Sequence, residues 1–377
     1  MMMQSDPYRN LQKHLDKFPI GFPETDSGVE IKLLQYLFSQ KEAQIAAKLN
    51  LMAEPASKII KRLKPMGIKL ADLEATLKAM EEKGTINCYL KRDGSRYYHV
   101  AFLAIGIFEY NVEFLTKEFY QLFKQYLDEA FRDEVIRTKI PQLRTIPTEG
   151  AITPELPIMP YDHVRLLIEE FPKEIAVANC VCKIGGDTIG HPCKVTDNRE
   201  ICLIFGSAAR KYDRLGWGRL ISKAEVFEVL DDSEKAGLVV QPSNTQKLFA
   251  ICLCCGCCCE ILTSAKMYEN PVQYFATNYQ AVVEQNICEG CKICETRCQM
   301  DAVLVADKVA SIDETRCIGC GICVPTCKSK AMRLVQKETV KDPPKDAARL
   351  YLDIMKKKVG RANYTIMLTK QLLGQLI

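Results

Sequence analysis

The amino-acid sequence predicts an α+β protein of several domains. Its 377 residues suggest about two to three domains. Runs with helical apolar spacing lead into two strand-like segments in the N-terminal third. Ten cysteines gather between Asn179 and Cys259, and eight more near the C-terminus fall into two copies of one spacing. We therefore expect an N-terminal part of helices and strands to be followed by cysteine-dependent parts.

The N-terminal part has the pattern of a winged helix. Gly84 follows the last of several segments with helical apolar spacing and is expected to be its C-cap, the segments being 29–38, 44–49, 56–63 and 70–80. Directly afterwards, the strand-like segments 86–90 and 97–101 flank Asp93 and Gly94, a pair that suits a tight hairpin turn. Three or more helices followed by a two-stranded hairpin predict a winged-helix domain.

A winged helix raises the question of DNA binding. The helix that would enter the groove, 69–83, carries three lysines against four acidic residues, whereas a phosphate-facing surface should be clearly basic. A basic stretch just before it, 58–64, keeps nucleic acid open as a partner. We place a protein-binding or scaffold role ahead of DNA reading, because the fold alone does not carry function.

Two further helical regions and a linker are expected. Leu115, Phe119, Leu122, Tyr126 and Ala130 predict an amphipathic helix over 111–137. Five prolines from Pro141 to Pro160 deny regular structure and predict a linker, with a domain boundary near Ala151. After Pro343 and Pro344, the helical stretches 346–359 and 362–377 are expected to pack back onto the protein.

The C-terminal cysteines read C-x2-C-x2-C-x3-C twice. The shift that superimposes Cys288 on Cys317 also pairs Ala302 with Ala331 and Val303 with Met332. This double spacing is the ligand pattern for two 4Fe-4S clusters, in which each fourth cysteine crosses to the other cluster. Zinc ribbons pair two C-x2-C units and use no third and fourth cysteine in this register, so two structural zinc sites are disfavoured.

The spacing and the stretch from Ile312 to Gly321 resemble the bacterial-type two-cluster ferredoxins. The resemblance implies that one cluster is held by Cys288, Cys291, Cys294 and Cys327, and the other by Cys298, Cys317, Cys320 and Cys323. That family usually has proline directly after each fourth cysteine, whereas this chain has Gln299 and Lys328 there. The local turns are therefore expected to differ.

A further metal site is predicted in the middle of the chain, because ten cysteines within about 80 residues far exceed ordinary core usage. The candidate ligands are a subset of Cys180, Cys182, Cys193, Cys202, Cys252, Cys254, Cys255, Cys257, Cys258 and Cys259. In a strand, Cys252 and Cys254 would point to one face and Cys255 to the other. A third iron–sulfur cluster is favoured, since the neighbouring module gives a redox site a partner, and zinc is the alternative.

Cys254, Cys255 and Gly256 are similar to the CCG motif of heterodisulfide-reductase-like subunits, which hold unusual clusters. That motif needs its own distant C-x2-C, and here the downstream one belongs to the ferredoxin-like spacing. His191 beside Cys193 is a weaker candidate ligand, because a lone histidine in such a loop is usually structural.

The segment between the two middle cysteine groups is expected to be an αβ unit. Ser222 and Glu225 have the form of a capping box, and Gly237 closes that helix before a strand at 238–240. The Gly-containing stretch 214–219 lacks the forms of a nucleotide loop, and no catalytic constellation is evident.

Composition and local sequence indicate which partners and which cellular location to expect. A net charge of +4 gives no polyanion-binding signature, and the longest nearly apolar run, 248–259, is too short to span a membrane. Residues 1–16 lack the apolar core of a secretion signal. We expect a cytoplasmic protein, in which thiols bind metals and do not form disulfides. An anaerobic host is a further expectation, because such clusters are commonly sensitive to oxygen.

As a whole, the order of parts resembles a group of anaerobe proteins described only as 4Fe-4S ferredoxin-like. The resemblance implies electron transfer. We expect a carrier or electron-wiring subunit for another oxidoreductase, with a redox-sensing winged-helix transcription regulator, or an oxidoreductase with a substrate site in the middle domain, as alternatives. The expected parts are an extension (1–24), a winged helix (25–105), a helix and linker (106–160), a cysteine-rich αβ domain (161–285), a two-cluster module (286–335) and a helical tail (336–377).

Overall fold

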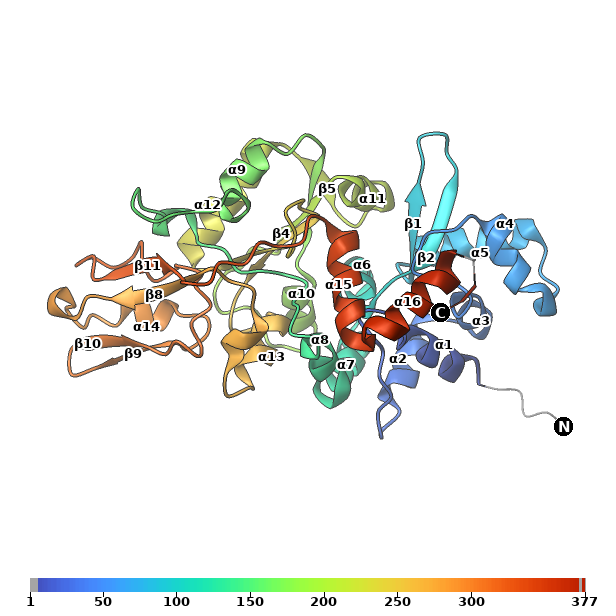
Figure 1. Cartoon of the computed structure of the whole chain (residues 1–377), viewed down its shortest axis with the longest axis horizontal. Helices are drawn as coiled ribbons and strands as arrows, with labels where there is room; N and C mark the ends of the chain where they lie inside the picture. The colour runs from blue at the N-terminus through green and yellow to red at the C-terminus, as the bar shows by residue number, and fades with distance from the viewer. Residues whose placement is uncertain (1–5, 373–374, 377) are drawn as a thin grey trace. The chain divides into compact units, whose positions relative to one another are not determined.

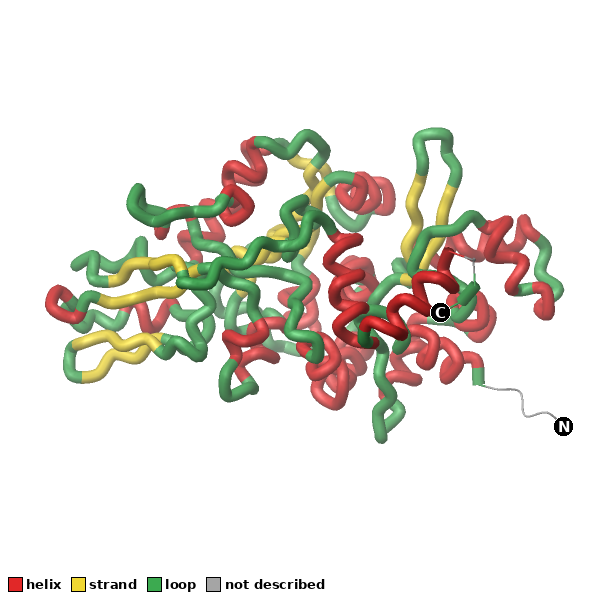
Figure 2. The backbone as a smooth tube through the Cα atoms, viewed as in Figure 1, coloured by secondary structure: helices red, strands yellow, loops and turns green. Residues whose placement is uncertain are grey.

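The computed structural model describes residues 6–372 and 375–376, and it divides the chain into two compact units. Unit 1 comprises Met1–Thr138 and Tyr351–Ile377, and unit 2 comprises Lys139–Leu350. Helices and strands are both present, which confirms the α+β class (Figures 1 and 2). The first residues of the expected extension, 1–5, and residues 373–374 and 377 of the expected last helix lie outside the description.

Unit 1 is mainly helical. A two-stranded antiparallel hairpin, β1 (Ile86–Leu90) and β2 (Arg96–Val100), pairs Ile86 with Val100 and turns at Gly94, whose φ is +83°. Glu54 adds a single bridge to Tyr98 of β2. The helices are α1 (Pro7–Leu15), α2 (Val29–Leu37), α3 (Gln40–Ala46), α4 (Ala56–Ile59), α5 (Leu70–Glu82), α6 (Phe108–Tyr110), α7 (Lys117–Tyr126), α8 (Arg132–Ile136) and α16 (Arg361–Leu372), with most of α15 (Ala347–Val359).

The predicted periodicity accounts for the core of unit 1. Leu33, Leu73, Leu77 and Met80 are fully buried, as the helical spacing required. Gly84, with φ of +76°, follows α5 directly after its C-cap Lys83. The expected helix over 111–137 begins later, at Lys117, where Thr116 caps α7 by accepting a hydrogen bond from the Phe119 amide.

Helix α15 contacts the rest of unit 1 through the partly buried Lys358 and through Tyr351. The Lys358 ammonium lies 2.6 Å from a Glu134 carboxylate oxygen and donates hydrogen bonds to the carbonyl oxygens of Asp16 and Phe18. Tyr351 packs against Phe102, with ring centroids 4.9 Å apart. These contacts join the end of the chain to the N-terminal segment of the same unit.

Unit 2 contains a five-stranded sheet in which every pairing is antiparallel, with the order β5-β3-β4-β7-β6. Its strands are β3 (Ile175–Asn179), β4 (Glu200–Phe205), β5 (Arg219–Ile221), β6 (Val239–Pro242) and β7 (Ala250–Cys254). The helices of this unit are α9 (Val164–Glu169), α10 (Val181–Thr188), α11 (Ser207–Leu215), α12 (Lys223–Ala236), α13 (Glu260–Lys266) and α14 (Ile293–Arg297). On one sheet face, Val177 and Leu203 pack against Val226 and Leu230 of α12.

The proline-rich segment expected as a linker is packed into unit 2. The Arg144 amide donates to the Pro242 carbonyl and the Ile146 amide to the Val240 carbonyl, so this segment runs beside β6. The buried Arg144 guanidinium is paired with Asp162 at 3.2 Å. The segment contains the 3-10 helix Glu149–Ala151, a second 3-10 helix begins at Pro160, and Ile146 and Ala151 are part of the core.

Two small antiparallel hairpin-like pairs complete unit 2. One joins β8 (Tyr279–Val283) to β11 (Met332–Gln336), and the other joins β9 (Val303–Ala306) to β10 (Val309–Ile312). Along the chain, the β9–β10 pair therefore lies between β8 and β11. Within the described part of the chain, no helix has both the length and the apolar character that crossing a bilayer requires.

Candidate metal centres

The C-terminal module of unit 2 repeats its backbone conformation as well as its cysteines. Residues with positive φ occur at three pairs of positions that are equivalent in the two halves: Gly290 and Gly319, Lys292 and Gly321, and Asp301 and Lys330. Their φ values lie between 54° and 74°. Both halves of the module thus use the same loop geometry around their cysteines, which the sequence repeat predicted.

Backbone amides donate to four of the cysteine sulfurs. The Ala281 amide in β8 donates to Cys317, and the Ala310 amide in β10 donates to Cys288, at 3.4 Å in each case. These two contacts are equivalent under the repeat, and each joins one half of the module to the first cysteine of the other. The amides of Ala302 and Met332 donate to the fourth cysteines, Cys298 and Cys327. Such N–H···S hydrogen bonds stabilise thiolate ligands and tune cluster potentials.

The electrostatic neighbours of the cysteines cross between the halves. Cys298 of the first half interacts with Cys317 of the second, and Cys320 interacts with both. Cys294 interacts with Cys291 and Cys288 of its own half and also with Cys323 of the second. Cys298 therefore has electrostatic neighbours in the second half of the module.

Burial shifts the pKa of several of these thiols upward. It raises the pKa of Cys294 and Cys298 and raises the pKa of Cys320 to about 12. A metal binds the thiolate, so loading this site releases protons. The buried thiols fit the cluster because the amide donors beside them compensate for the negative charge that ligation brings.

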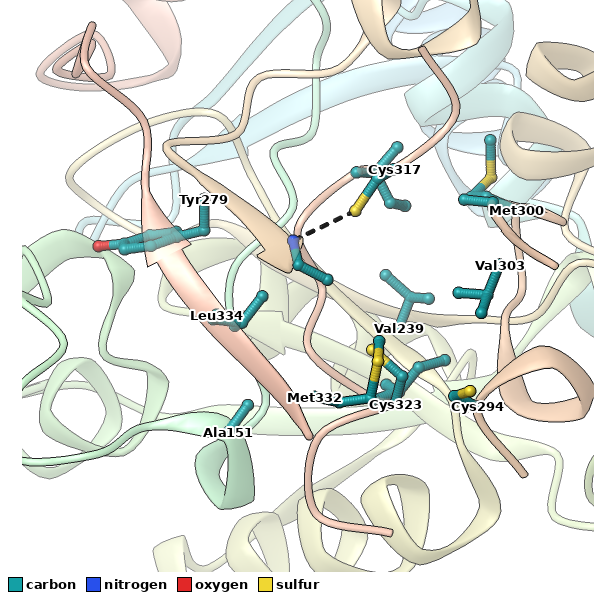
Figure 3. Close-up of a cluster of buried hydrophobic side chains, with 14 of the residues drawn as sticks. Ala151, Val239, Tyr279, Cys294, Met300, Val303, Cys317, Cys323, Met332 and Leu334 are labelled. Atoms are coloured by element: carbon teal, nitrogen blue, oxygen red, sulfur yellow. Dashed lines mark hydrogen bonds between the residues drawn. The ribbon is translucent and has the colours of Figure 1, made fainter. Parts of the chain in front are cut away.

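Apolar side chains pack around the buried cysteines of the module (Figure 3). Cys294, Cys317 and Cys323 are buried among Met300, Val303, Met332 and Leu334 and other members of one core. The dashed line in Figure 3 marks the Ala281 amide directed at the Cys317 sulfur. Exclusion of water lowers the local dielectric and is one of the features that set cluster potentials.

Four middle-domain cysteines form a compact thiolate set, which we call set A: Cys193, Cys255, Cys257 and Cys258. Among the described residues, theirs is the group whose ligand atoms all lie within 4.8 Å of one another. Four of the six separations between their sulfurs run from 3.0 Å for Cys255–Cys258 to 3.8 Å for Cys193–Cys257. Cys257 is exposed and the other three are buried. The set combines the loop before β4 with the turn that follows β7.

Lys183 in α10 lies against set A and is 1% exposed. Its ammonium nitrogen is 3.2 Å from the Cys193 sulfur and 3.1 Å from the Cys255 sulfur. Burial opposes the ammonium charge, yet the thiolates, led by Cys255, raise the pKa of Lys183. A buried cation needs an anionic partner, so this contact favours deprotonated cysteines, the form that binds metals.

Five other middle-domain cysteines lie outside set A: Cys180, Cys182, Cys252, Cys254 and Cys259. The Cys182 thiol interacts with Cys180 and Cys259, and the Cys254 thiol interacts with Cys252 and Cys259. Cys202, also a candidate ligand, lies in β4 opposite Ala178. His191 is exposed and its amide donates to the Gly186 carbonyl, so it does not join set A.

Gln299 connects the C-terminal module to the turn that carries set A. Its side-chain oxygen accepts a hydrogen bond of 2.6 Å from the Gly256 amide, and its side-chain nitrogen donates to the Gly237 carbonyl at 3.1 Å. A Cβ on Gly256 would lie 2.2 Å from the Gln299 carbonyl oxygen, so glycine is required by this close approach. Gln299 stands where ferredoxins usually have proline, and a proline cannot make these side-chain contacts.

Sequence reasoning missed the roles of Lys183 and Gln299. Lys183 directly follows Cys182, and nothing in its local sequence indicates that its side chain is buried. The presence of Gln299 where ferredoxins usually have proline could have indicated a special contact. The partners of its side chain, Gly256 and Gly237, lie far from Gln299 along the chain.

Comparison with known proteins gives one family match. A model of the 4Fe-4S binding domain matches residues 310–333, which contain Cys317, Cys320, Cys323 and Cys327. The searches of curated proteins and of solved structures found no significant match. The chain therefore carries a ferredoxin-like 4Fe-4S binding module towards its C-terminus, and its role is iron–sulfur electron transfer in general terms.

Proposed function

We propose that the C-terminal module holds two 4Fe-4S clusters with ligands exchanged between its halves. Cys288, Cys291, Cys294 and Cys327 would bind one cluster, and Cys298, Cys317, Cys320 and Cys323 the other. The observation that carries this proposal is the symmetric pair of amide contacts, Ala281 to Cys317 and Ala310 to Cys288. When bound, such clusters accept and release single electrons.

The protein acts, in this proposal, as an electron carrier or as a wiring subunit for another oxidoreductase. The chain positions the clusters, shields them with the apolar core around Cys294, Cys317 and Cys323, and directs amides at their thiolates. Unit 1 would supply a docking surface for the redox partner. Cys291, which is exposed, marks the side of the module from which a partner would approach a cluster.

Set A would hold a further metal, for which a third iron–sulfur cluster and zinc were the expectations. A tetrahedral ion bound at about 2.3 Å by each thiolate keeps its sulfurs about 3.8 Å apart. Four separations in set A, from 3.0 to 3.8 Å, are at or below that spacing, and all four sulfurs lie within 4.8 Å of one another. They favour a single ion, zinc or iron, over a cluster at this position.

Unit 1 supports a scaffold role better than DNA reading. Two lysines that would face phosphates are already paired, Lys78 with Glu82 and Lys83 with Glu42. Salt-sensitive binding of unit 1 to DNA fragments that depends on cluster oxidation would instead favour the redox-sensing regulator.

The test is anaerobic purification of the full chain followed by iron and sulfide analysis and spectroscopy of the reduced protein. We expect at least about eight iron and eight sulfide per chain, with the magnetic signature of two interacting clusters. A chain that carries zinc in the eight C-terminal cysteines, or one without sulfide, would overturn the proposal. Reduction of the clusters by a captured flavoprotein or hydrogenase would identify the partner class.

A further inference from the structure

The two halves of the C-terminal module share one cysteine spacing but differ in exposure. The shift that relates the halves superimposes the loop 287–292 on the loop 316–321. Four of the six residues in the first loop are exposed, whereas four of the six in the second are buried and none is exposed. Cys291 is exposed, and the equivalent Cys320 is partly buried. The same loop is therefore open to solvent in one half and shielded in the other.

Residues 148–151, which we call the cover segment, pack on the second loop. The Thr148 amide donates a hydrogen bond of 3.0 Å to the Cys320 carbonyl oxygen. A Cβ on Gly321 would lie 2.6 Å from the Ala151 side chain, so the cover segment and the loop are in close contact. Ala151 also lies in the buried core that contains the cysteines of this loop (Figure 3). The proline-rich part of the chain thus shields one half of the module.

The cover segment is what distinguishes the two loops, because their other close contacts are equivalent. A Cβ on Gly290 would lie 2.5 Å from the Lys308 carbonyl oxygen. A Cβ on Gly319 would lie 2.1 Å from the Tyr279 carbonyl oxygen, which holds the same position under the repeat. Lys292 stands in the first loop where the second has the glycine that contacts the cover segment, and Lys292 is exposed. The repeat therefore supplies its own uncovered reference.

We propose that the module has an outer cluster, held by the exposed loop, which exchanges electrons with the partner protein, and an inner cluster, held by the covered loop, which exchanges electrons through the outer one. A shell that excludes water also excludes the surface of a partner, and solvent access is one of the features that set cluster potentials. One electron would leave the reduced partner for the outer cluster and pass on to the inner one, so the partner is oxidised by one electron. The inference rests on the proposed function, because it requires two clusters, and it adds their order.

Substitutions at Thr148 test the cover segment. Thr148 has φ of −70°, which proline adopts, and Thr148→Pro removes the amide that donates to Cys320. Thr148→Val is the matched control, because it keeps that amide and removes only a buried hydroxyl that has no hydrogen-bond partner among the described residues. Each full-length protein is loaded with iron and sulfide anaerobically, and loss of the clusters to a soluble iron chelator is followed by electron paramagnetic resonance. Cys291→Ala and Cys320→Ala identify the signals of the outer and the inner cluster.

In the unaltered chain, we expect the outer cluster to be lost first and the inner cluster more slowly. Thr148→Pro should speed the loss of the inner cluster about fivefold, because local opening becomes easier by the worth of one hydrogen bond, and it should leave the outer cluster unaffected. Thr148→Val should change neither rate. Equal rates for the two clusters of the unaltered chain, or earlier loss of the inner cluster, would overturn the inference.

Two measurements on the unaltered chain guard against a misfolded variant. A soluble paramagnetic complex that cannot enter the protein should broaden the signal of the outer cluster more than that of the inner one. After rapid mixing with a chemically reduced flavoprotein, the signal of the outer cluster should appear first. Equal broadening of both signals, or earlier reduction of the inner cluster, would contradict the proposed order.

These outcomes are distinct from failure of the proposed function. A chain without sulfide, or one with zinc in the eight C-terminal cysteines, refutes the two clusters themselves. Two intact clusters that are equally accessible to the chelator and to the paramagnetic complex refute only their division into outer and inner.

Discussion

His14 in α1 is a buried imidazole that makes unit 1 sensitive to acid. Its Nε2 lies 2.7 Å from the Leu49 carbonyl oxygen, and its ring packs edge-on against Phe18. Burial is the main reason that the pKa of His14 falls to about 4, and the positive charges of Lys17, Lys48 and Arg62 add to the effect. The folded protein therefore holds this side chain neutral over a range where the unfolded chain protonates it.

The first prediction concerns the pH dependence of stability. Because the folded pKa lies below the unfolded value of about 6.5, the contribution of His14 is complete above that pH and is lost as pH falls towards about 4. The full loss is about 3 kcal/mol. His14→Gln keeps a donor for Leu49 and does not titrate, so its unfolding free energy should fall less between about pH 7 and about pH 5. Denaturant unfolding at the two pH values, monitored in unit 1, measures the difference; parallel curves would refute the role of His14.

Gln299 gives the second prediction at the scale of single residues. Gln299→Ala removes the acceptor of the Gly256 amide and the donor to the Gly237 carbonyl. The free energy of unfolding of unit 2 should fall by about 1–3 kcal/mol, because a partly buried amide loses its partner. Amide exchange at Gly256 should become faster at the same time.

The repeat provides a matched control for Gln299. Lys328 occupies the equivalent position in the second half of the module, and it is exposed. Lys328→Ala should change stability by less than about 0.5 kcal/mol. Equal effects of the two substitutions would show that the Gln299 contacts do not hold the module to the turn after β7.

At the scale of elements, Gly319 and Gly190 in the cysteine loops both have a left-handed backbone conformation. A Cβ on Gly319 would lie 2.1 Å from the Tyr279 carbonyl oxygen in β8, and its φ is +67°. Gly190 has φ of +78° but nothing within 4 Å of the added atom. The two positions therefore share an unfavourable backbone conformation and differ in the space available.

The third prediction compares alanine at these two positions. Gly190→Ala should cost about 1–2 kcal/mol, the penalty of a left-handed conformation alone. Gly319→Ala should cost clearly more, because β8 must move, and it should lower the iron content, since the adjacent Ala281 amide donates to Cys317. Unfolding curves and iron analysis of both variants provide the measurement. Similar losses in both would argue against tight packing of the loop on β8.

Local elements were the part of the fold that the sequence could predict. The hairpin formed with its turn at Gly94, and the strand expected at 97–101 begins one residue earlier. The capping box of Ser222 and Glu225 opens α12, and Gly237 ends it in a left-handed conformation. These features depend on neighbours close in sequence, so short sequence windows contain them.

Long-range pairing was not predictable in the same way. The sheet order β5-β3-β4-β7-β6 joins strands from 175 to 254, and the sequence only suggested that Cys252 and Cys254 would face away from Cys255. The structure places these cysteines in different cores, as that alternation requires. It also brings Lys183 to Cys255, a partner distant along the chain that no local pattern indicates. Pairing of this kind depends on the packing of the whole unit.

At the scale of the whole molecule, unit 2 gathers the cysteine-rich middle segment and the 4Fe-4S binding module into one compact body, and unit 1 unites Met1–Thr138 with Tyr351–Ile377. The domain boundary expected near Ala151 and the linker expected around it remain predictions. The winged helix and the partner of unit 1 also remain predictions. The proposed electron-transfer role depends most on the exchange of cysteines between the halves of the C-terminal module.

The fourth prediction tests that exchange. Cys291→Ala and Cys327→Ala remove ligands from different halves but from one proposed cluster, and Cys320→Ala removes a ligand from the other. Mössbauer and electron paramagnetic resonance spectra of the iron-loaded full-length variants distinguish the two clusters. We expect Cys291→Ala and Cys327→Ala to lose the same spectral component, and Cys320→Ala to lose the other. Loss of the same component from Cys327→Ala and Cys320→Ala would contradict the account.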